Sequence, residues 1–448
     1  MPKKKTALTI EERLQQALVP AEEQPYEVPE NWVWVRLESV ASWGSGGTPS
    51  RKHEEYYNGD ILWIKTGELN NGWIYDTEEK ITDEGLKKSS AKLFPPYSVL
   101  IAMYGATIGK VAILGVPATT NQACACAVCN QSLLYMYLFY YCISQKNVFI
   151  EKGKGGAQPN ISQIILKQHP IPLPPLSEQQ RIVERIEELF AKLDEAKERL
   201  QEVADSFAVR KAAILHKAFT GELIGKKIEQ LVPLESLVDL IKIGPFGSAL
   251  HESDYIENGI PLVNPKHIVQ QHIVPQSKIS ISEEKAEELS SYKLKENDIV
   301  LGRRGEMGRC APISNREENW ICGTGSMIIR LKKEYDAKLY SLILGSQATV
   351  TYLENSAVGS TLKNLNEKIV RKIPVPQFSN EEQHEIVRLI DDLLARERTA
   401  QQAAEQALAS IELMKKSILA RAFRGELGTN KASEASALEL LKQVLAEN

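Results

Sequence analysis

The chain has 448 residues, of which 43% are hydrophobic and 25% are charged, the balance of an ordinary folded protein. Its formal net charge is −4, with 54 Lys and Arg against 58 Asp and Glu, which argues against a chain that coats nucleic acid with positive charge. The composition excludes a disordered chain, a collagen and a disulfide-bonded miniprotein, and the length predicts about three domains.

Three absences in the sequence favour a cytoplasmic protein. No run of about 18 apolar residues is present, which predicts no transmembrane helix. The N-terminus starts with basic residues but lacks the apolar stretch and the cleavage site of a secretory signal peptide. The six cysteines do not have the spacing of a disulfide framework, which favours a reducing compartment.

The local pattern predicts short elements along most of the chain. Amphipathic helices are expected at residues 10–18 and 434–446, and further helices at 135–150 and 335–355. β-rich stretches such as residues 59–64 and 98–103 lie between turns rich in glycine and proline, so the regions around them are predicted to be mixed α/β.

Three cysteines, Cys124, Cys126 and Cys129, alternate with small residues. This pattern is typical of a buried strand with reduced thiols, and a zinc site completed by Cys142 is the alternative.

The chain contains an internal repeat. Asn160 to Leu223 aligns without gaps onto Asn364 to Leu427 at a constant offset of 204, and upstream of this stretch the offset drifts to 197. The constant offset indicates a scaffold of the same length in both copies. The drifting offset upstream indicates that the two α/β regions differ in the lengths of their loops and elements.

The rigid part of the repeat is predicted to be a long helix in each copy. From 182 to 214, and again from 386 to 418, apolar residues mostly follow alternating steps of four and three, the spacing of a coiled-coil seam. Arg210 breaks the first seam, and the larger Leu200, Val203 and Phe207 are expected opposite alanines of the second. Pro174-Pro175 precedes the first helix, and Gly221 and Gly425 end the two, giving about 38 residues and about 57 Å each.

No catalytic motif is complete. Phe94-Pro95-Pro96-Tyr97 is similar to the Asn/Asp-Pro-Pro-aromatic motif of amino-methyltransferases, but Phe94 cannot accept a hydrogen bond from a target amine. Gly105 to Lys110 is one residue short of a phosphate-binding loop, and a hairpin tip that presents Lys110, or Arg309 in the second copy, is the better interpretation. We therefore expect a chain that is not an enzyme.

Several duplicated motifs resemble the specificity subunit of type I restriction–modification systems. They are Leu173 to Ile182, both Ala-Phe-Xaa-Gly-Glu-Leu endings, Gly46-Gly47-Thr48-Pro49 and Gly244-Pro245-Phe246-Gly247-Ser248. The resemblance covers about residues 28–428, in the same order twice. The second copy departs from the pattern at Ser379 to Gln383, where the Pro-Leu-Ser-Glu-Gln form is absent.

The resemblance implies a fold class of two α/β (α+β) target recognition domains joined by two long antiparallel coiled-coil helices, with a pseudo-two-fold internal repeat. Six segments follow: a helical extension (1–31), target recognition domain 1 (32–176), the central long helix and linker (177–224), target recognition domain 2 (225–377), the second long helix (378–428) and a tail helix (429–448). The two recognition domains are slightly positive and the other segments negative.

The resemblance also implies the function and the partners. Each domain would read one half of a bipartite, asymmetric sequence in double-stranded DNA, and the helices would set the spacer. Two modification subunits would methylate adenine with S-adenosylmethionine, and two restriction subunits would move along DNA with ATP and Mg²⁺. No cofactor and no metal are expected in this chain itself.

Candidate binding residues combine this resemblance with the donors that read bases. The DNA-binding candidates are Thr48, Arg51, Lys52, Lys65, Lys110, Asn121 and Gln122 in the first domain and Ser248, Lys266, His267, Arg303, Arg304 and Arg309 in the second. The partner-binding candidates, off the seam or at the helix ends with half of the ring exposed, are Arg185, Glu188, Lys192, Glu195, Phe219 and Phe423. The alternative function is a coiled-coil scaffold whose α/β regions bind proteins.

Overall fold

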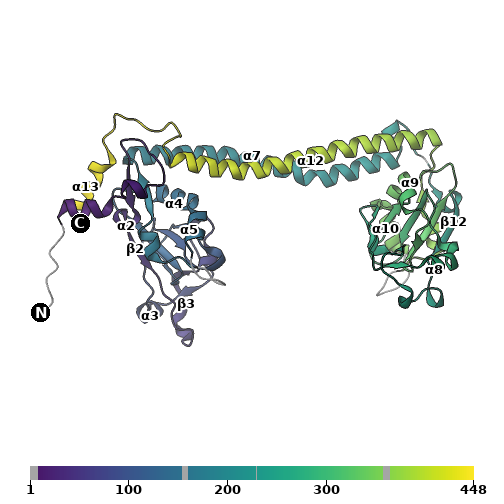
Figure 1. The fold of residues 1–448 in the computed structure, drawn as a ribbon, viewed down its shortest axis with the longest axis horizontal. Coiled ribbons are helices and arrows are strands. Elements are labelled where there is room, and N and C mark those ends of the chain that lie inside the picture. Colours follow the sequence, from purple (N-terminus) through teal and green to yellow (C-terminus); the bar gives the residue numbers. More distant parts are fainter. Residues whose placement is uncertain (1–8, 154–159, 229, 357–363, 448) are drawn as a thin grey trace. The chain divides into compact units, whose positions relative to one another are not determined.

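The computed structural model describes residues 9–153, 160–228, 230–356 and 364–447, and the chain divides into two compact units. The first unit is formed by Met1–Arg199 with Ala407–Asn448, and the second by Leu200–Gln406. Each unit contains one α/β region and one part of two long helices, α7 (Leu176–Phe219) and α12 (Asn380–Ala422) (Figure 1). The α/β regions and the two long helices that the sequence predicts are therefore confirmed.

The α/β region of the first unit is built on a five-stranded sheet in the order β2-β9-β6-β7-β4. Its strands are β2 (Ala41–Ser45), β9 (Cys124–Cys129), β6 (Val99–Ala102), β7 (Val111–Leu114) and β4 (Trp73–Ile74). All neighbours are antiparallel except β4 and β7. The expected cysteine strand is confirmed as β9, where burial raises the pKa of the Cys126 thiol to about 12.

Two smaller sheets complete this region. They are β5 (Lys80–Ile81), β3 (Tyr57–Ile64) and β8 (Thr119–Thr120), and the pair β1 (Val33–Arg36) with β10 (Pro170–Leu173). The helices are α2 (Leu37–Val40), α3 (Asp83–Lys87), α4 (Tyr135–Ser144), α5 (Lys146–Lys152) and α6 (Gln163–Lys167). The single helix expected over 135–150 is two helices, because the backbone leaves the α conformation at Gln145.

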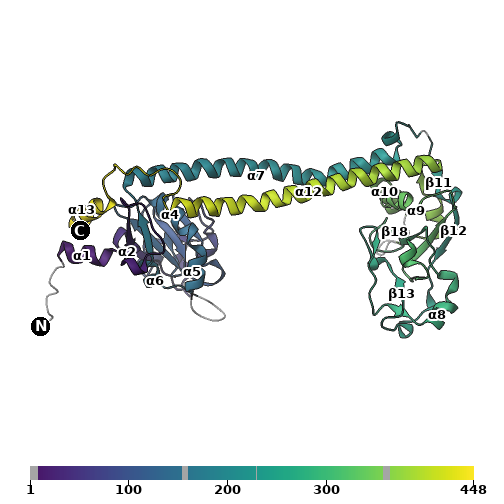
Figure 2. The ribbon, with the colours of Figure 1, turned by 45° about the horizontal axis from the view of Figure 1, so that its top comes forward.

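The second unit repeats this plan (Figure 2). Its sheets are β12 (Val238–Ile243), β20 (Ser326–Leu331), β17 (Asp298–Gly302) and β18 (Cys310–Pro312); β16 (Ser280–Ile281), β13 (Ile260–Val263) and β19 (Ile321–Cys322); β14 (Ile268–Val269) with β15 (His272–Ile273); and β11 (Val232–Pro233) with β21 (Pro374–Val375). Its helices are α8 (Glu283–Glu288), α9 (Ala337–Leu344), α10 (Gln347–Ser356) and α11 (Glu367–Arg371).

One glutamine from each repeat fastens a long helix to its own α/β region. Gln179 accepts a hydrogen bond from the Leu134 backbone N–H (2.8 Å) and donates to the Ser132 carbonyl (2.9 Å). Gln383 makes the same two bonds, at the same distances, to Asp336 and Glu334. Both glutamines are buried, so the Glu-Gln pair shared by the two repeats has a structural reason.

The long helices span 44 and 43 residues, longer than the sequence predicts, because each begins about six residues before its first seam position, at Leu176 and at Asn380. Gly221 (φ +81°) and Gly425 (φ +75°) follow in the left-handed conformation, as expected for residues that end a helix. Among the described residues, no helix is both long enough and apolar enough to cross a membrane.

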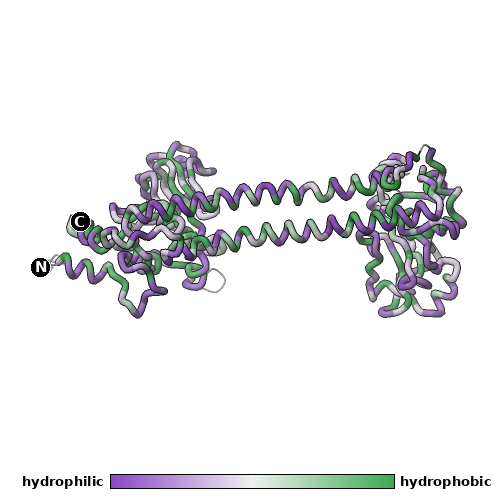
Figure 3. Tube along the Cα trace, turned by 90° about the horizontal axis from the view of Figure 1, so that it is seen from above, coloured by the Kyte–Doolittle hydropathy of each residue, from purple (hydrophilic) through white to green (hydrophobic). Residues whose placement is uncertain are grey.

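The two helices lie side by side within each unit (Figure 3), and they run antiparallel, since Asp194 contacts Lys415 and Lys197 contacts Glu412. In the first unit Lys197 contacts Glu412 (2.7 Å). In the second, Arg210 contacts Glu397 (2.9 Å), so the basic residue that breaks one seam meets an acidic residue that breaks the other. Phe207 is buried as expected, whereas the expectation for Val203 is wrong, because this side chain is 45% exposed.

Both ends of the chain belong to the first unit. The terminal helices α1 (Ile10–Ala17) and α13 (Ala437–Glu447) contact each other, and the Arg13 guanidinium donates to the Leu445 carbonyl. The buried Glu178 carboxylate accepts hydrogen bonds from Trp32 and Asn430, both at 2.8 Å. Burial raises the pKa of Glu178, and its hydrogen bonds oppose this effect.

Candidate DNA-recognition sites

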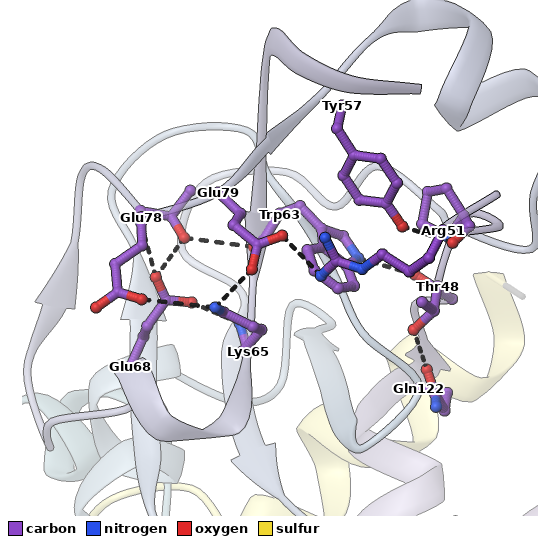
Figure 4. Close-up of polar contacts among 12 residues, drawn as sticks. Thr48, Arg51, Tyr57, Trp63, Lys65, Glu68, Glu78, Glu79 and Gln122 are labelled. Atoms are coloured by element: carbon purple, nitrogen blue, oxygen red, sulfur yellow. Dashed lines mark hydrogen bonds and ion pairs between the residues drawn. The ribbon is translucent and has the colours of Figure 1, made fainter. Parts of the chain in front are cut away.

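The glycines after β2 allow the chain to pass closely against the small sheet of the first region. A Cβ on Gly46 would lie 1.7 Å from the Thr120 carbonyl oxygen, and one on Gly47 would lie 2.1 Å from the Ser90 hydroxyl oxygen. No other residue fits these positions without moving the backbone. The next residue, Thr48, is exposed, and its hydroxyl donates to the Gln122 side-chain oxygen at 2.5 Å (Figure 4).

Arg51 lies on an aromatic support. Its guanidinium is 4.3 Å from the ring centre of Tyr57 and 5.2 Å from that of Trp63, and it forms an ion pair with Glu79 at 2.7 Å (Figure 4). Both rings are fixed by hydrogen bonds to the glycine loop, from Tyr57 to the Pro49 carbonyl and from Trp63 to the Gly47 carbonyl. The arrangement limits the rotamers of Arg51 and leaves its side chain 57% exposed.

Lys65 shares the same carboxylate. Its ammonium lies 2.8 Å from Glu79 and 3.5 Å from Glu78 (Figure 4). The hydrogen bond to Glu79 raises the pKa of Lys65 and lowers that of Glu79. Glu68 closes the turn by accepting from the Lys65 backbone N–H at 2.6 Å. The cluster therefore holds two cations in place before any ligand is bound.

The structure brings four of the seven candidates of the first region together, namely Thr48, Arg51, Lys65 and Gln122. Lys52 is exposed beside Arg51 on the chain, and the Asn121 side chain accepts from the Ala123 backbone N–H (3.1 Å). Lys110 lies elsewhere, in the turn between β6 and β7, which confirms the predicted hairpin.

Sequence reasoning missed the residues that position these cations. Tyr57, Trp63 and Glu79 support Arg51, but no local spacing connects them to it, because Tyr57 and Trp63 lie on β3 and Glu79 lies just before β5. The only feature of the sequence that could have indicated this cluster is the acidic pair Glu78-Glu79, whose charge is opposite to that of Arg51 and Lys65.

In the second region, the hairpin between β17 and β18 carries three arginines with different surroundings. Arg303 is partly buried, and its Nε donates to the Leu365 carbonyl (3.1 Å); burial and the neighbouring Arg304 lower its pKa. Arg309 forms an ion pair with Glu306. Arg304 is exposed. The predicted hairpin is confirmed. Arg303 and Arg309 form contacts within the domain, whereas Arg304 is exposed to solvent.

The other candidates of the second region lie after β13 and β12. Lys266 is exposed, whereas His267 is only 1% exposed and its ring donates to the Leu262 carbonyl at 2.8 Å. His267 is the last residue of its short turn, as Glu68 is of the corresponding turn in the first region, and its burial gives it a role inside the fold. Ser248 lies in the short turn Gly247–Ala249, and its side chain is outside the described residues.

The partner-binding candidates lie mostly on the outer surface of α7. Arg185 and Lys192 both pair with Glu188 at 2.6 Å, and Glu195 pairs with Arg199. Such exposed pairs stabilise a helix little, so these charges are available for other contacts. Phe219 is half-buried. The exposed half expected for Phe423 is wrong, because this ring is 1% exposed and contacts Tyr137 and Tyr141 in the core of the first region.

The thiols remain free in the structure, and Cys124, Cys126 and Cys142 are buried. Within the described ranges, no group of three or more His, Cys, Asp or Glu side chains is placed to hold a metal ion.

Comparison with known proteins assigns the family. The model of the type I restriction modification DNA specificity domain matches residues 29–205 and again 235–407. The chain is 25% identical, over 94% of its length and 93% of the relative's, to the type I restriction enzyme EcoBI specificity subunit of Escherichia coli. It is 29% identical to the MjaIX specificity subunit of Methanocaldococcus jannaschii, over 62% of this chain and 68% of that one.

Solved structures show the same fold. The HsdS subunit from Thermoanaerobacter tengcongensis is similar with a TM-score of 0.63 at 20% identity, over 90% of this chain and all of that one. A chain solved in work on complex assembly and conformational transition of the type I R-M system is similar over the same shares, with a TM-score of 0.66 at 20% identity. With two matched regions, each on its own α/β unit, the chain belongs to the type I restriction–modification specificity subunits and contains two DNA recognition domains.

Proposed function

We propose that each recognition domain reads one half of a bipartite, asymmetric DNA target, and that the chain itself carries out no chemistry. The observation that carries this proposal is that the two domains share one backbone plan but present different polar side chains. The first presents Thr48 beside Gln122 and Arg51 and Lys65 around Glu79, and the second presents Arg304 on its hairpin. Two non-identical surfaces of one plan suit two non-identical half-sites.

The charge pairs of the first domain suit this role. An exposed guanidinium or ammonium can bind phosphate oxygens or the acceptor edge of guanine, and one that is already held by Tyr57, Trp63 and Glu79 loses less side-chain entropy on binding. The two domains carry only a small excess of positive charge. Binding by this chain alone is therefore expected to be modest and salt-sensitive, and the partner subunits would add further contacts.

The long helices would set the spacer between the half-sites and recruit the partners. We propose two modification subunits, which methylate adenine with S-adenosylmethionine, and two restriction subunits, which use ATP and Mg²⁺, all working with this chain in the cytoplasm. The exposed charges of α7, including Arg185, Glu188, Lys192 and Glu195, are the proposed contact surface. A solved relative of this fold comes from work on assembly of the type I R-M system, which supports a role within a complex.

The test is to co-express the chain with its modification subunit and map methylated adenines across a genome. A bipartite, asymmetric target is expected. Replacing residues 32–176 with the first domain of a relative should change one half of that target, and replacing residues 225–377 should change the other. A target that is not bipartite, or a change in both halves after one replacement, would contradict the proposal.

A further inference from the structure

The two recognition domains hold the tips of their central hairpins in the same backbone frame. In the first, the Met103 N–H donates to the Ala123 carbonyl (2.9 Å), and the Met103 carbonyl accepts from Ile161 (2.9 Å). In the second, Arg303 makes the same two bonds, to Gly325 (2.8 Å) and from Leu365 (3.0 Å). Met103 and Arg303 are thus structural equivalents, although the sequences around them do not align well.

The next residue along each hairpin is matched in the same way. Tyr104 forms an isolated antiparallel bridge with Asn160, and Arg304 forms one with Asn364. In each tip a glycine with positive φ follows, at +60° for Gly105 and +82° for Gly305, with open space around the place of a Cβ.

A second glycine closes each tip against the helix that covers it. Gly109 (φ +74°) lies against Lys146 of α5, and Gly308 (φ +75°) lies against Val350 of α10. The backbone of each tip is therefore fixed by its hydrogen bonds on one side and by the covering helix on the other. The Cα atom of residue 104 or 304 consequently has a fixed position.

The side chains at this matched position differ in chemistry and are both presented to solvent. Tyr104 is 46% exposed, and Arg304 is exposed. Within the described part of the chain, neither side chain forms a hydrogen bond or an ion pair, whereas the neighbouring Arg303 and Arg309 side chains both do. A fixed backbone that presents a side chain with no hydrogen-bond partner in the described part of the chain suits direct base reading, and the residue at this position differs between the two domains.

We infer that Tyr104 and Arg304 are matched specificity-determining residues, each contacting a base edge in the half-site of its own domain. The inference rests on the proposed reading of one half-site by each domain, and it adds a residue to the first site that lies outside the Arg51–Lys65 cluster. Arginine donates two parallel hydrogen bonds to O6 and N7 of guanine. Tyrosine cannot form that pair, since it has a single hydroxyl and a flat apolar ring. The two domains therefore read different bases from one frame.

The test uses the assembled methyltransferase and a panel of duplexes in which each base pair of each half-site is changed in turn. Tyr104→Arg should move the preference at one position of the first half-site toward a G·C pair, by about tenfold to a hundredfold in methylation rate, with the second half-site unchanged. Arg304→Ala should relax one position of the second half-site by a similar factor and leave the first unchanged. Tyr75→Ala, at another exposed tyrosine of the same domain, is the matched control and should change no base preference.

The outcomes separate the inference from the proposed function. If the unaltered complex shows no bipartite target, the proposed function fails. If the target is bipartite but Tyr104→Arg and Arg304→Ala keep every base preference, or slow methylation of all duplexes equally as loss of a phosphate contact would, the inference alone fails. Because both positions are exposed, the variants should keep the melting temperature of the unaltered chain, and Tyr104→Phe gives a second, milder variant should Tyr104→Arg unfold.

Discussion

If the paired helices set the spacer, lengthening both at facing positions should lengthen the DNA target and leave its bases unchanged. Arg210 of α7 contacts Glu397 of α12, and the two helices are antiparallel. Ala204, nearly two turns before Arg210, therefore lies approximately opposite Ala404, about two turns after Glu397. Four residues inserted after Val203 and after Ala404 would add about 6 Å to each helix, against about 66 Å for the present α7. At about 3.4 Å per base pair, the spacer should grow by about two base pairs.

The assay is genome-wide mapping of methylated adenines with the lengthened chain in the assembled methyltransferase. The control is the same insertion in α7 alone, which would move Arg210 by about one turn from Glu397 and break the register of the seam. That variant is expected to lose stability without a clean change of spacer. Full methylation with an unchanged spacer in the doubly lengthened chain would refute the reasoning and leave the helices as a binding surface for partners.

Three further predictions concern the stability of the first domain and the binding of a partner. Gly46→Ala should cost about 2 kcal/mol or more of unfolding free energy in urea titrations, because its Cβ would meet the Thr120 carbonyl, whereas Gly67→Ala, with nothing within 4 Å, should be neutral. Glu178→Ala should cost about 2 kcal/mol in the same titrations by leaving Trp32 and Asn430 unpaired, and Glu178→Gln clearly less; equal losses would contradict this. Reversing the charges of the proposed contact surface on α7 should abolish co-purification with the modification subunit at an unchanged melting temperature, and retained co-purification would move that interface to the recognition domains.

Periodicity predicts the helices of this protein well and its sites poorly. The seam from Ile182 onward identifies α7 because burial follows the heptad spacing at most seam positions, Val203 excepted, and the constant offset of 204 identifies its counterpart. The same pattern could not show that Arg210 meets Glu397, since pairing across an antiparallel seam depends on register. Composition similarly suggests base-reading donors but cannot separate Arg304, which is exposed, from His267, which is buried. That difference arises from tertiary packing of turns.

The first unit contains both the start of the chain, up to Arg199, and its last part, from Ala407 onward. The core of the first domain includes Phe423, and its rim includes Asn430, so about 200 residues of the second unit are made before these contacts can form. Synthesis proceeds from the N-terminus, so the second unit is completely synthesised before the first unit, although its first residue is made later. The first domain must wait with an incomplete core between Tyr137 and Tyr141, the place that Phe423 later fills. A chain cut short after Gln406, where the second unit ends, would thus lose the integrity of the domain at its opposite end in sequence, while keeping the one beside the cut.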